Sequence, residues 1–269
     1  MIGESTLSIQ YCSDLHVEQH GSMPPLVRSA PYLALLGDLG EWEANQAEYQ
    51  RFVAQCSRVW VGVFLVAGNH EFHGSKTMGT TRAEMRAFCD GLGNVHFLDN
   101  SVANVEGVRF LGTTLWSHVD DAFRAEVERL IPDFSRVTVA GDSGGGDPRP
   151  LTTRDTNALH QEALRWLEAA LADARRDGVP VVVLSHHAPL DVGTSHPKYE
   201  VPENRGVNSA YASDLAALVR WPVRAWLFGH THHATWLLRG DGVQVCSNPR
   251  GSPEERLDFE PHASVDVAR

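Results

Sequence analysis

Five short polar blocks that could bind metal ions follow apolar runs of the chain. They are Asp14–Leu15–His16, Gly37–Asp38, Gly68–Asn69–His70–Glu71, Ser185–His186–His187 and Gly229–His230–Thr231–His232. In layered α/β folds, ligands bind at the loops that leave the carboxyl ends of the strands, so we expect the five blocks to meet at one edge of the sheets. The blocks offer imidazole, carboxylate and amide groups but no thiolate, a ligand set suited to Mn, Fe, Zn or Co. They therefore predict a centre that holds two divalent metal ions.

Seven side chains of these blocks are the predicted metal ligands: Asp14, His16, Asp38, Asn69, His186, His230 and His232. If the Asp38 carboxylate bridges the two ions, each ion receives four protein ligands and keeps positions for water. Two divalent cations, two carboxylates and one bridging hydroxide leave a charge of about +1. A chain with a formal net charge of -11 would thus present a cationic pocket to an anionic substrate.

The order and spacing of the blocks resemble the calcineurin-like metallophosphoesterase superfamily, whose pattern is D-x-H, G-D, G-N-H-[DE], H and G-H-x-H. The match runs from Asp14 to His232, which is most of the chain. The resemblance implies a four-layer sandwich of two mixed β-sheets flanked by helices. It also implies how the ligands divide between the ions: one takes Asp14, His16, Asp38 and His232, and the other takes Asp38, Asn69, His186 and His230.

Two details of this match concern single residues. In the doublet His186–His187 we assign the first histidine as the ligand, because the family's ligand is typically the first histidine of such a block. The loop after Asp38 reads Leu39–Gly40–Glu41–Trp42 and lacks the second aspartate that many members have. The resemblance therefore does not say which groups surround the metals on that side.

The resemblance implies hydrolysis of a phosphoester, in which a hydroxide shared by the two ions attacks phosphorus. Coordination to a metal can lower the pKa of water to about 7, so such a nucleophile exists near neutral pH. The predicted catalytic residues are Asp38, as the bridging ligand, and His70. His70 matches the family's catalytic histidine, which binds a phosphate oxygen or protonates the leaving alkoxide, and Glu71 could orient its ring. The alternative for His70 is a capping role or a place outside the ligand set.

Four further residues are candidates for substrate contacts: Trp116, His118, Asn208 and Arg250. Each has an ordinary alternative, because Trp116 could be a core residue, Asn208 a helix cap and Arg250 a residue of a surface turn. The histidines without a supporting block are predicted not to bind metal: His20, His73, His96, His160, His196, His233 and His262.

Apolar runs predict the strands that carry these blocks. They are Leu7–Tyr11, Tyr32–Leu36, Val59–Ala67, Val108–Gly112, Val181–Ser185, Ala225–Phe228, Trp236–Leu238 and Val243–Cys246. Their near-continuous apolarity indicates strands covered on both faces. Helical periodicity predicts a long helix from Thr153 that ends before Gly178, and shorter helices at Ala44–Ser57, Thr81–Asp90, Asp121–Ile131 and Ser209–Val219. The last two strands should form a hairpin, and the whole chain, residues 1–269, an α/β fold of one domain.

Composition excludes several classes of function. The chain has 269 residues, with 34 acidic side chains against 23 lysines and arginines, so nucleic-acid coating and membrane-surface binding are disfavoured. Its four cysteines form no CxxC pair, which argues against a disulfide scaffold and against a thiolate zinc site. We see no signal peptide, and the apolar stretches are shorter than the roughly twenty residues of a membrane helix. These features predict a cytoplasmic protein.

Two short motifs resemble those of other enzymes but lack their context. Gly141–Asp142–Ser143–Gly144–Gly145 spells the nucleophile signature of chymotrypsin-like proteases, whose β-barrels and disulfides this chain does not predict. Ser195–His196–Pro197–Lys198 matches the SxxK of penicillin-binding enzymes, but its proline disfavours the helix that the motif needs. We interpret the glycine-rich stretch 141–150 as a surface loop rather than a lid.

Three functions remain to be separated. The first is a metal-dependent phosphohydrolase, for instance with manganese, acting on a small phosphomonoester, phosphodiester or nucleotide. The second is a non-catalytic metal-binding scaffold of the same fold, against which the complete ligand set and His70 argue. The third is a nuclease, which the acidic net charge disfavours.

Overall fold

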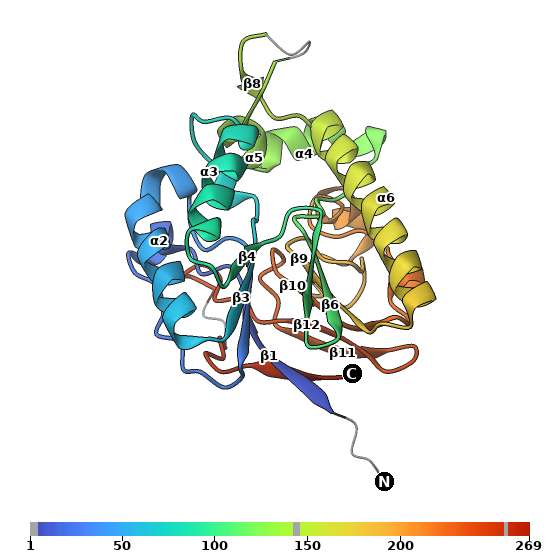
Figure 1. Cartoon of the computed structure of the whole chain (residues 1–269). Coiled ribbons are helices and arrows are strands. Elements are labelled where there is room, and N and C mark those ends of the chain that lie inside the picture. The colour runs from blue at the N-terminus through green and yellow to red at the C-terminus, as the bar shows by residue number, and fades with distance from the viewer. Residues whose placement is uncertain (1–4, 142–145, 256–257) are drawn as a thin grey trace.

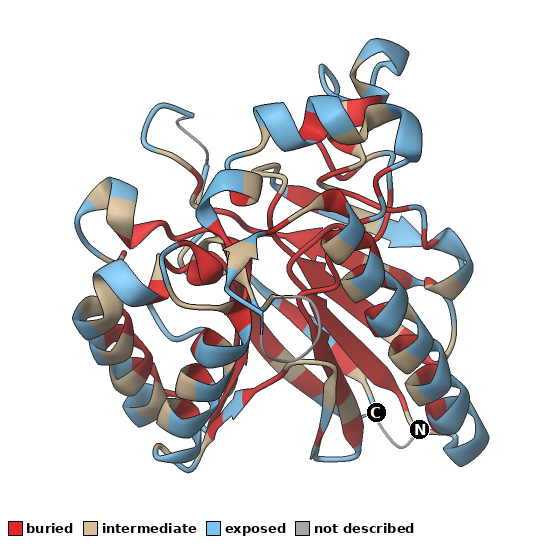
Figure 2. Cartoon of the chain, turned by 90° about the horizontal axis from the view of Figure 1, so that it is seen from above, coloured by how far each residue is buried: buried red, intermediate tan, exposed pale blue. Residues whose placement is uncertain are grey.

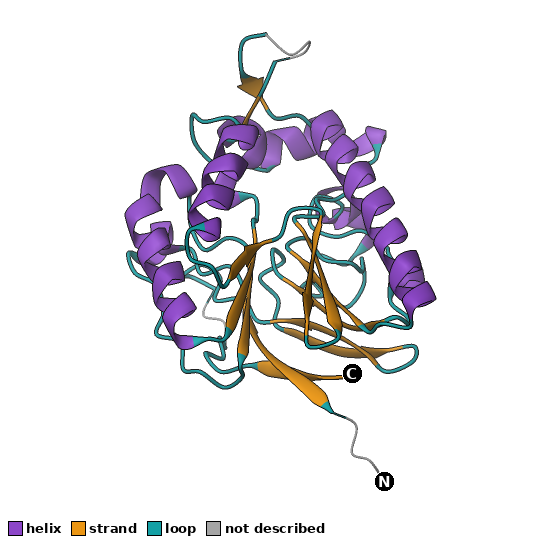
Figure 3. Ribbon diagram, in the orientation of Figure 1, coloured by secondary structure: helices purple, strands orange, loops and turns teal. Residues whose placement is uncertain are grey.

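The computed structural model describes residues 5–141, 146–255 and 258–269 of the chain. Two β-sheets lie face to face, and helices cover their outer faces (Figures 1 and 3). The strand order is β13-β1-β2-β3-β4 in the first sheet and β11-β12-β10-β9-β6-β5 in the second, and β7 pairs with β8 separately. The strands are β1 Thr6–Cys12, β2 Tyr32–Leu36, β3 Gly62–Val66, β4 Val95–Phe97, β5 Ser101–Val105, β6 Val108–Thr113, β7 Thr138–Val139, β8 Arg149–Pro150, β9 Val181–Ser185, β10 Val223–Phe228, β11 Thr235–Arg239, β12 Val243–Ser247 and β13 Ser264–Ala268.

Both large sheets are mixed. In the first, β1, β2, β3 and β4 run parallel and β13 is antiparallel to β1. In the second, β6, β9, β10 and β12 run parallel, and the edge strands β5 and β11 are antiparallel to their neighbours. Because parallel strands end on the same edge of a sheet, the loops after β1, β2 and β3 gather on one edge, as do those after β9 and β10.

Three apolar layers separate the sheets and helices, which makes four layers of structure. Alternate residues of a buried strand serve different layers, since successive side chains point to opposite faces. In β3, Val63 and Leu65 pack toward the outer helices, whereas Phe64 and Val66 pack between the two sheets. Phe64 stacks there on Phe110 of the second sheet, with ring centroids 4.0 Å apart. The predicted sandwich of two mixed sheets flanked by helices is confirmed.

Helices α2 and α3 cover the first sheet, and α6 covers the second (Figure 1). Each buries one side and exposes the other, as Figure 2 shows. The long helix α6 begins with a capping box, in which the Thr152 and Asp155 side chains satisfy each other's backbone N–H groups, and ends at Gly178 with φ 67°. The helices are α1 Val17–His20, α2 Trp42–Val59, α3 Met78–Asp90, α4 Arg124–Leu130, α5 Asp133–Arg136, α6 Thr153–Asp177 and α7 Arg205–Asn208, with 3₁₀ turns η1 His70–Phe72, η2 Asp121–Phe123, η3 Pro202–Asn204 and η4 Ala216–Leu218.

The predicted helix Ser209–Val219 is wrong. The Ala188 backbone N–H donates to the Tyr211 carbonyl, and the Ser213 N–H donates back to the Ala188 carbonyl. This bridge holds residues 211–213 extended, so only the 3₁₀ turn η4 forms after it. The predicted strand Val59–Ala67 is also too long, because Val59 ends α2 and the strand begins at Gly62.

Strands β4, β5 and β13 were not predicted, and all three lie at or beside sheet edges, where apolar runs are short. The predicted hairpin of β11 and β12 forms, with Arg239 opposite Val243. Residues 142–145 of the glycine-rich loop, and with them most of the protease-like motif, lie outside the described residues. All four cysteines are buried free thiols. Among the described helices, none is both long and apolar enough to cross a membrane.

Candidate metal centre

The five polar blocks follow the carboxyl ends of β1, β2, β3, β9 and β10, as predicted. Five of the seven predicted ligands have left-handed backbone, with φ between 45° and 70°: Asp14, His16, Asp38, His230 and His232. Such a conformation costs a non-glycine residue about 1–3 kcal/mol, so the surrounding structure must hold it in place. Strain is thus concentrated where the strands turn into the site.

Two glycines allow the strand-end loops to approach closely. A Cβ atom at Gly68 would overlap the Asp38 carboxylate, and one at Gly229 would lie 2.9 Å from Asp14 Oδ2. The glycine in G-N-H and the glycine in G-H-x-H therefore make room for the carboxylates of neighbouring strands. This is a reason for the motif glycines beyond turn formation.

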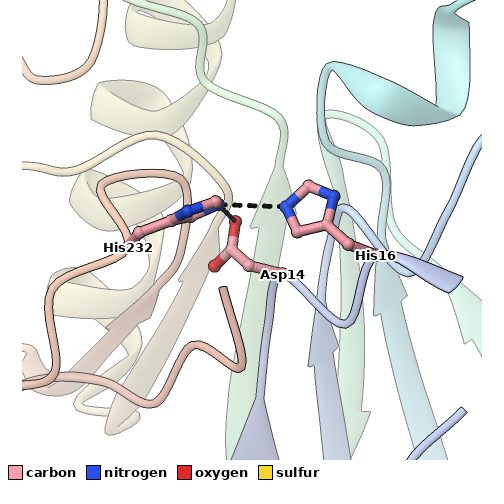
Figure 4. Close-up of side chains that lie close together, drawn as sticks. All are labelled: Asp14, His16 and His232. Carbon is pink, nitrogen blue, oxygen red and sulfur yellow. Dashed lines mark hydrogen bonds and ion pairs between the residues drawn. The ribbon is translucent and has the colours of Figure 1, made fainter. Parts of the chain in front are cut away.

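One group of predicted ligands consists of Asp14, His16 and His232, which come from opposite ends of the chain (Figure 4). The Nε2 atoms of His16 and His232 face each other at 2.9 Å. His232 Nε2 lies 3.6 Å from Asp14 Oδ1. The Asp14 carboxylate also accepts the backbone N–H of His230, which fixes the loop after β10 against the loop after β1.

A second group centres on the Asp38 carboxylate. Three imidazole Nε2 atoms surround its Oδ2: His186 at 3.4 Å, and His16 and His70 at 3.9 Å each. His186 Nε2 also lies 2.9 Å from Asn69 Oδ1, and His230 completes a group with Asp38 and His186. Asp38 therefore belongs to two groups of donors, one with His16 and His70 and one with His186 and His230.

The outward nitrogens of the ligand histidines are already engaged. His16 Nδ1 lies 2.8 Å from Glu18 Oε1, His186 Nδ1 2.8 Å from the Leu36 carbonyl, and His232 Nδ1 2.6 Å from Glu255 Oε2. Each Nδ1–H donates to an oxygen, which turns Nε2 inward toward the other predicted ligands. This is how metal-binding histidines are oriented in proteins. The residues present therefore fit divalent metal ions.

The electrostatics of the cluster also suit cations. Burial raises the pKa of Asp38, but His186 and His70 outweigh it and hold that pKa well below its ordinary value of 3.8. Burial lowers the pKa of His186, but Asp38 raises it to about 9. The ionised Asp38 thus attracts protons to its neighbours, and a divalent cation would displace those protons on binding.

The two histidines that follow β9, His186 and His187, have different surroundings. His186 faces Asp38 and Asn69, whereas His187 Nδ1 faces the Thr114 carbonyl at 3.3 Å and its ring stacks on His230 at 4.0 Å. Burial, with the neighbouring His186, lowers the pKa of His187 to about 3, so His187 is a neutral packing residue. This geometry favours the first histidine as the ligand.

The predicted partner of His70 is wrong. The Glu71 carboxylate points away and accepts the backbone N–H groups of Asp38, Leu39 and Gly68 at 2.7–2.9 Å, tying the loops after β2 and β3 together. His70 Nδ1 instead lies 3.0 Å from Glu18 Oε1. Sequence reasoning missed Glu18, although it stands two residues after His16 in the first block.

Asp133, on the short helix α5, was also missed. Its Oδ1 accepts Asn69 Nδ2 at 2.9 Å and His73 Nε2 at 2.7 Å. Because Asn69 Nδ2 donates to Asp133, Asn69 Oδ1 faces His186, which is the orientation that a metal ligand at this position requires. No pattern around residue 133 signals this role.

Glu41, His70 and His73 form a fourth group of donors. The Arg136 guanidinium, however, lies 2.6 Å from Glu41 Oε1 and supplies positive charge there, so we assign no metal to this group. The other six histidines predicted not to bind metal lie outside all groups found among the described residues.

A cavity of about 560 Å³ opens over the centre. Its lining includes Asp38, Asn69, His70, His230 and His232, and also the predicted substrate contact Asn208.

The other three candidate substrate contacts do not line this cavity. Trp116 is 3% exposed and stacks between Phe72 and His187, and His118 lines a separate hollow. Arg250 donates from Nη1 to the carbonyls of Leu15 and Ser22. These contacts favour the alternative of a core residue for Trp116 and of a turn residue for Arg250.

Two face-to-face mixed sheets with a histidine–carboxylate cluster at their strand ends define a metal-dependent α/β enzyme. A model of the calcineurin-like phosphoesterase family matches residues 7–234, and the chain therefore belongs to this family and is a metal-dependent phosphoesterase. An uncharacterized protein of Acanthamoeba polyphaga mimivirus is 26% identical over an alignment of 246 residues, which covers 88% of this chain and 84% of that protein.

Solved structures share the fold at low identity. Phosphopantetheinyl hydrolase from Mycobacterium tuberculosis is 21% identical with a TM-score of 0.63, and the match covers 97% of this chain and 96% of that one. A dimetal phosphatase from Danio rerio is 14% identical with a TM-score of 0.52, and the match covers 97% and 92%. These similarities establish the architecture.

Proposed function

We propose that the protein hydrolyses a phosphomonoester or phosphodiester of a small molecule or nucleotide, with two divalent metal ions as cofactors. One ion is held by Asp14, His16, Asp38 and His232, and the other by Asp38, Asn69, His186 and His230. The observation that carries the proposal is the ring of three Nε2 atoms around Asp38 Oδ2, at 3.4–3.9 Å. Mn, Fe, Zn and Co all suit this ligand set.

The metal ions, when bound, supply a nucleophile near neutral pH and positive charge for the phosphoryl oxygens. Apart from its histidines, the chain contributes little other cationic charge to the cavity. Of the described residues that line it, Arg136 is the one arginine or lysine, and Glu41 already pairs with it. Binding of the phosphate therefore depends mainly on the metal ions, and the metal-free protein should bind the substrate weakly.

His70 is the proposed proton donor to the leaving group. It lines the cavity with its side chain 20% exposed, whereas the side chains of Asp38 and His186 are buried. Burial lowers the pKa of His70, but Asp38 and Glu18 outweigh it and raise that pKa to about 10. The imidazole is therefore protonated near neutral pH before metal binds, with its proton available to a departing oxygen.

The test is metal-dependent turnover by the purified protein. Metal content is measured by mass spectrometry, and 4-nitrophenyl phosphate and bis(4-nitrophenyl) phosphate are offered with Mn²⁺, Zn²⁺, Fe²⁺ or Co²⁺. We expect up to two metal equivalents, turnover of at least one substrate, its loss on chelation and its return with metal. Two bound ions without turnover would favour a scaffold, and no bound metal would contradict the proposal.

The same assay separates the scaffold from the enzyme through His70→Ala. We expect this variant to keep both metals and to lose turnover, since its ring is not among the proposed ligands. A screen of phosphorylated metabolites and cyclic nucleotides would then identify the substrate class. His118→Ala, which alters a residue outside the cavity, is the matched control.

A further inference from the structure

One carboxylate joins the metal centre to the proposed proton donor. Glu18 Oε1 lies 2.8 Å from His16 Nδ1 and 3.0 Å from His70 Nδ1. The two rings meet edge to face, with centroids 4.5 Å apart. Both Nδ1–H groups therefore donate to a single oxygen, and both Nε2 atoms end at 3.9 Å from Asp38 Oδ2.

The local fold holds Glu18 in this position. Helix α1 begins at Val17, immediately after the left-handed His16, and so returns the residue at 18 toward the ring of His16. The Glu18 side chain is 13% exposed, and its Oε2 is buried with no hydrogen-bond partner among the described residues.

The loop after Asp38 accommodates this carboxylate. A Cβ atom at Gly40 would overlap Val17 and lie 3.2 Å from Glu18 Oε2. Glycine at this position thus leaves the space in which Val17 and Glu18 lie. Glu41 of this loop lies within 4.8 Å of His70 but pairs with Arg136, and the hydrogen bond to His70 Nδ1 comes from Glu18 of the preceding block instead.

We propose that Glu18 is a positioning residue that orients the metal ligand His16 and the proton donor His70 together. The inference rests on the proposed function. Glu18 accepts Nδ1–H from both rings, so His16 presents its Nε2 lone pair to the centre and His70, as the proton donor, presents Nε2–H. A ligand of one metal and the proton donor thus share a support, and a change at Glu18 disturbs metal binding and proton transfer at once.

Glu255 provides a matched control, because it accepts the His232 Nδ1–H as Glu18 accepts the His16 Nδ1–H, but its hydrogen bonds in the described structure do not reach His70. Glu18→Gln and Glu255→Gln are compared in two assays. The first is a Mn²⁺ titration by calorimetry, which requires no activity. The second is a measurement of kcat at saturating Mn²⁺ with two substrates, 4-nitrophenyl phosphate and phenyl phosphate. The phenolate leaving group of phenyl phosphate is more basic than 4-nitrophenolate, so its departure depends more on a proton donor.

We expect both variants to bind metal about 10–100-fold more weakly. At saturating metal, Glu255→Gln should recover kcat with both substrates. Glu18→Gln should keep a loss of about tenfold or more with phenyl phosphate and a much smaller loss with 4-nitrophenyl phosphate. Adding His70→Ala to Glu18→Gln should then cost less than His70→Ala costs the wild type, because the two residues act through one step.

Two results would overturn the inference: full recovery of Glu18→Gln with phenyl phosphate at saturating metal, or equal losses with both substrates. If circular dichroism shows Glu18→Gln unfolded, Glu18→Asp carries the test, because it keeps the charge and its shorter side chain reaches one ring at most. A wild-type protein without turnover would contradict the proposed function, while the metal titration would still test the link between Glu18 and His16.

Discussion

Two sets of residues line the cavity, and they are built differently. We call the strand-end residues Asp38, Asn69, His70, His230 and His232 the floor, and the residues of segments 131–136 and 195–211 the rim. On the floor, Asp38 is 2% exposed and Asn69 4%, and both side chains are fixed by hydrogen bonds. On the rim, Tyr199 is 47% exposed and the helices α5 and α7 have four residues each.

This difference separates chemistry from selectivity. Ligands of a metal must be held within a fraction of an ångström, and the floor obtains that precision from hydrogen-bonded carboxylates such as those of Glu71, Glu18 and Glu255. The rim must accept an organic group, and it includes exposed polar side chains such as Tyr199 and Arg136. Changes to the floor should therefore affect metal binding and kcat, whereas changes to the rim should affect KM.

The largest expected effect comes from closing the space beside the Asp38 carboxylate. In Gly68→Ala the new methyl group would overlap the Asp38 carboxylate, so the loop after β2 or β3 must move. We expect a loss of about 1–3 kcal/mol in the free energy of unfolding of the metal-free protein, and an activity at least a hundredfold lower at limiting metal. Thermal unfolding and a Mn²⁺ titration measure the two effects.

Gly79→Ala is the matched control for this substitution. Gly79 lies in α3, and a Cβ atom there meets only Thr77 Oγ1, at 4.0 Å. We expect this variant to be about 0.5 kcal/mol more stable than the wild type, with unchanged metal binding. Equal free energies of unfolding and equal Mn²⁺ affinities in the two variants would show that the space around Asp38 is not as tightly packed as we argue.

The floor was largely predictable from the sequence, because its residues follow buried strands in fixed blocks. Asp38, Asn69 and His230 each stand directly after a glycine at a strand end, and short-range spacing suffices to place them. The partners that orient them were not predictable in the same way. Asp133 approaches Asn69 from 64 positions along the chain, and only the packing of α5 shows it.

The rim was poorly predicted for a related reason. The apolar spacing of Ser209–Val219 favours a helix, but a long-range backbone bridge between Ala188 and residues 211–213 overrides that preference. Similarly, the tryptophan after β6 has the position of a site residue, yet Trp116 is a core residue that packs on Phe72. Tertiary contacts decide such cases, and a single sequence does not reveal them.

A smaller effect is expected on the rim. Asn208 lines the cavity, and its Nδ2 lies 3.5 Å from the Asp191 carbonyl, a weak hydrogen bond that leaves the amide available. For Asn208→Ala we expect KM for the best substrate of the screen to rise about tenfold, with kcat changed less than threefold and metal affinity unchanged. Steady-state kinetics at saturating metal measure both constants. A fall in kcat with constant KM would place Asn208 functionally with the floor.

The smallest effect concerns the support of the rim, at the start of α6. Burial raises the pKa of Asp155, but hydrogen bonds from Arg149 and Thr152 outweigh it and lower that pKa below 3.8. A carboxylate with a lowered folded-state pKa stabilises the protein above its unfolded pKa, and this stabilisation disappears as pH falls through the folded value. Asp155→Asn should therefore cost about 1 kcal/mol at pH 7 and progressively less below pH 3.8. Denaturant unfolding of the variant and the wild type, at pH 7 and below pH 3.8, measures how this cost changes with pH.

The control is Asp173→Asn, which alters an exposed residue of the same helix. We expect its free energy of unfolding to lie within about 0.5 kcal/mol of the wild type. A cost that stayed constant with pH would mean that the charge of Asp155 contributes nothing, and that the shape of the capping box alone holds this end of α6 beneath the rim.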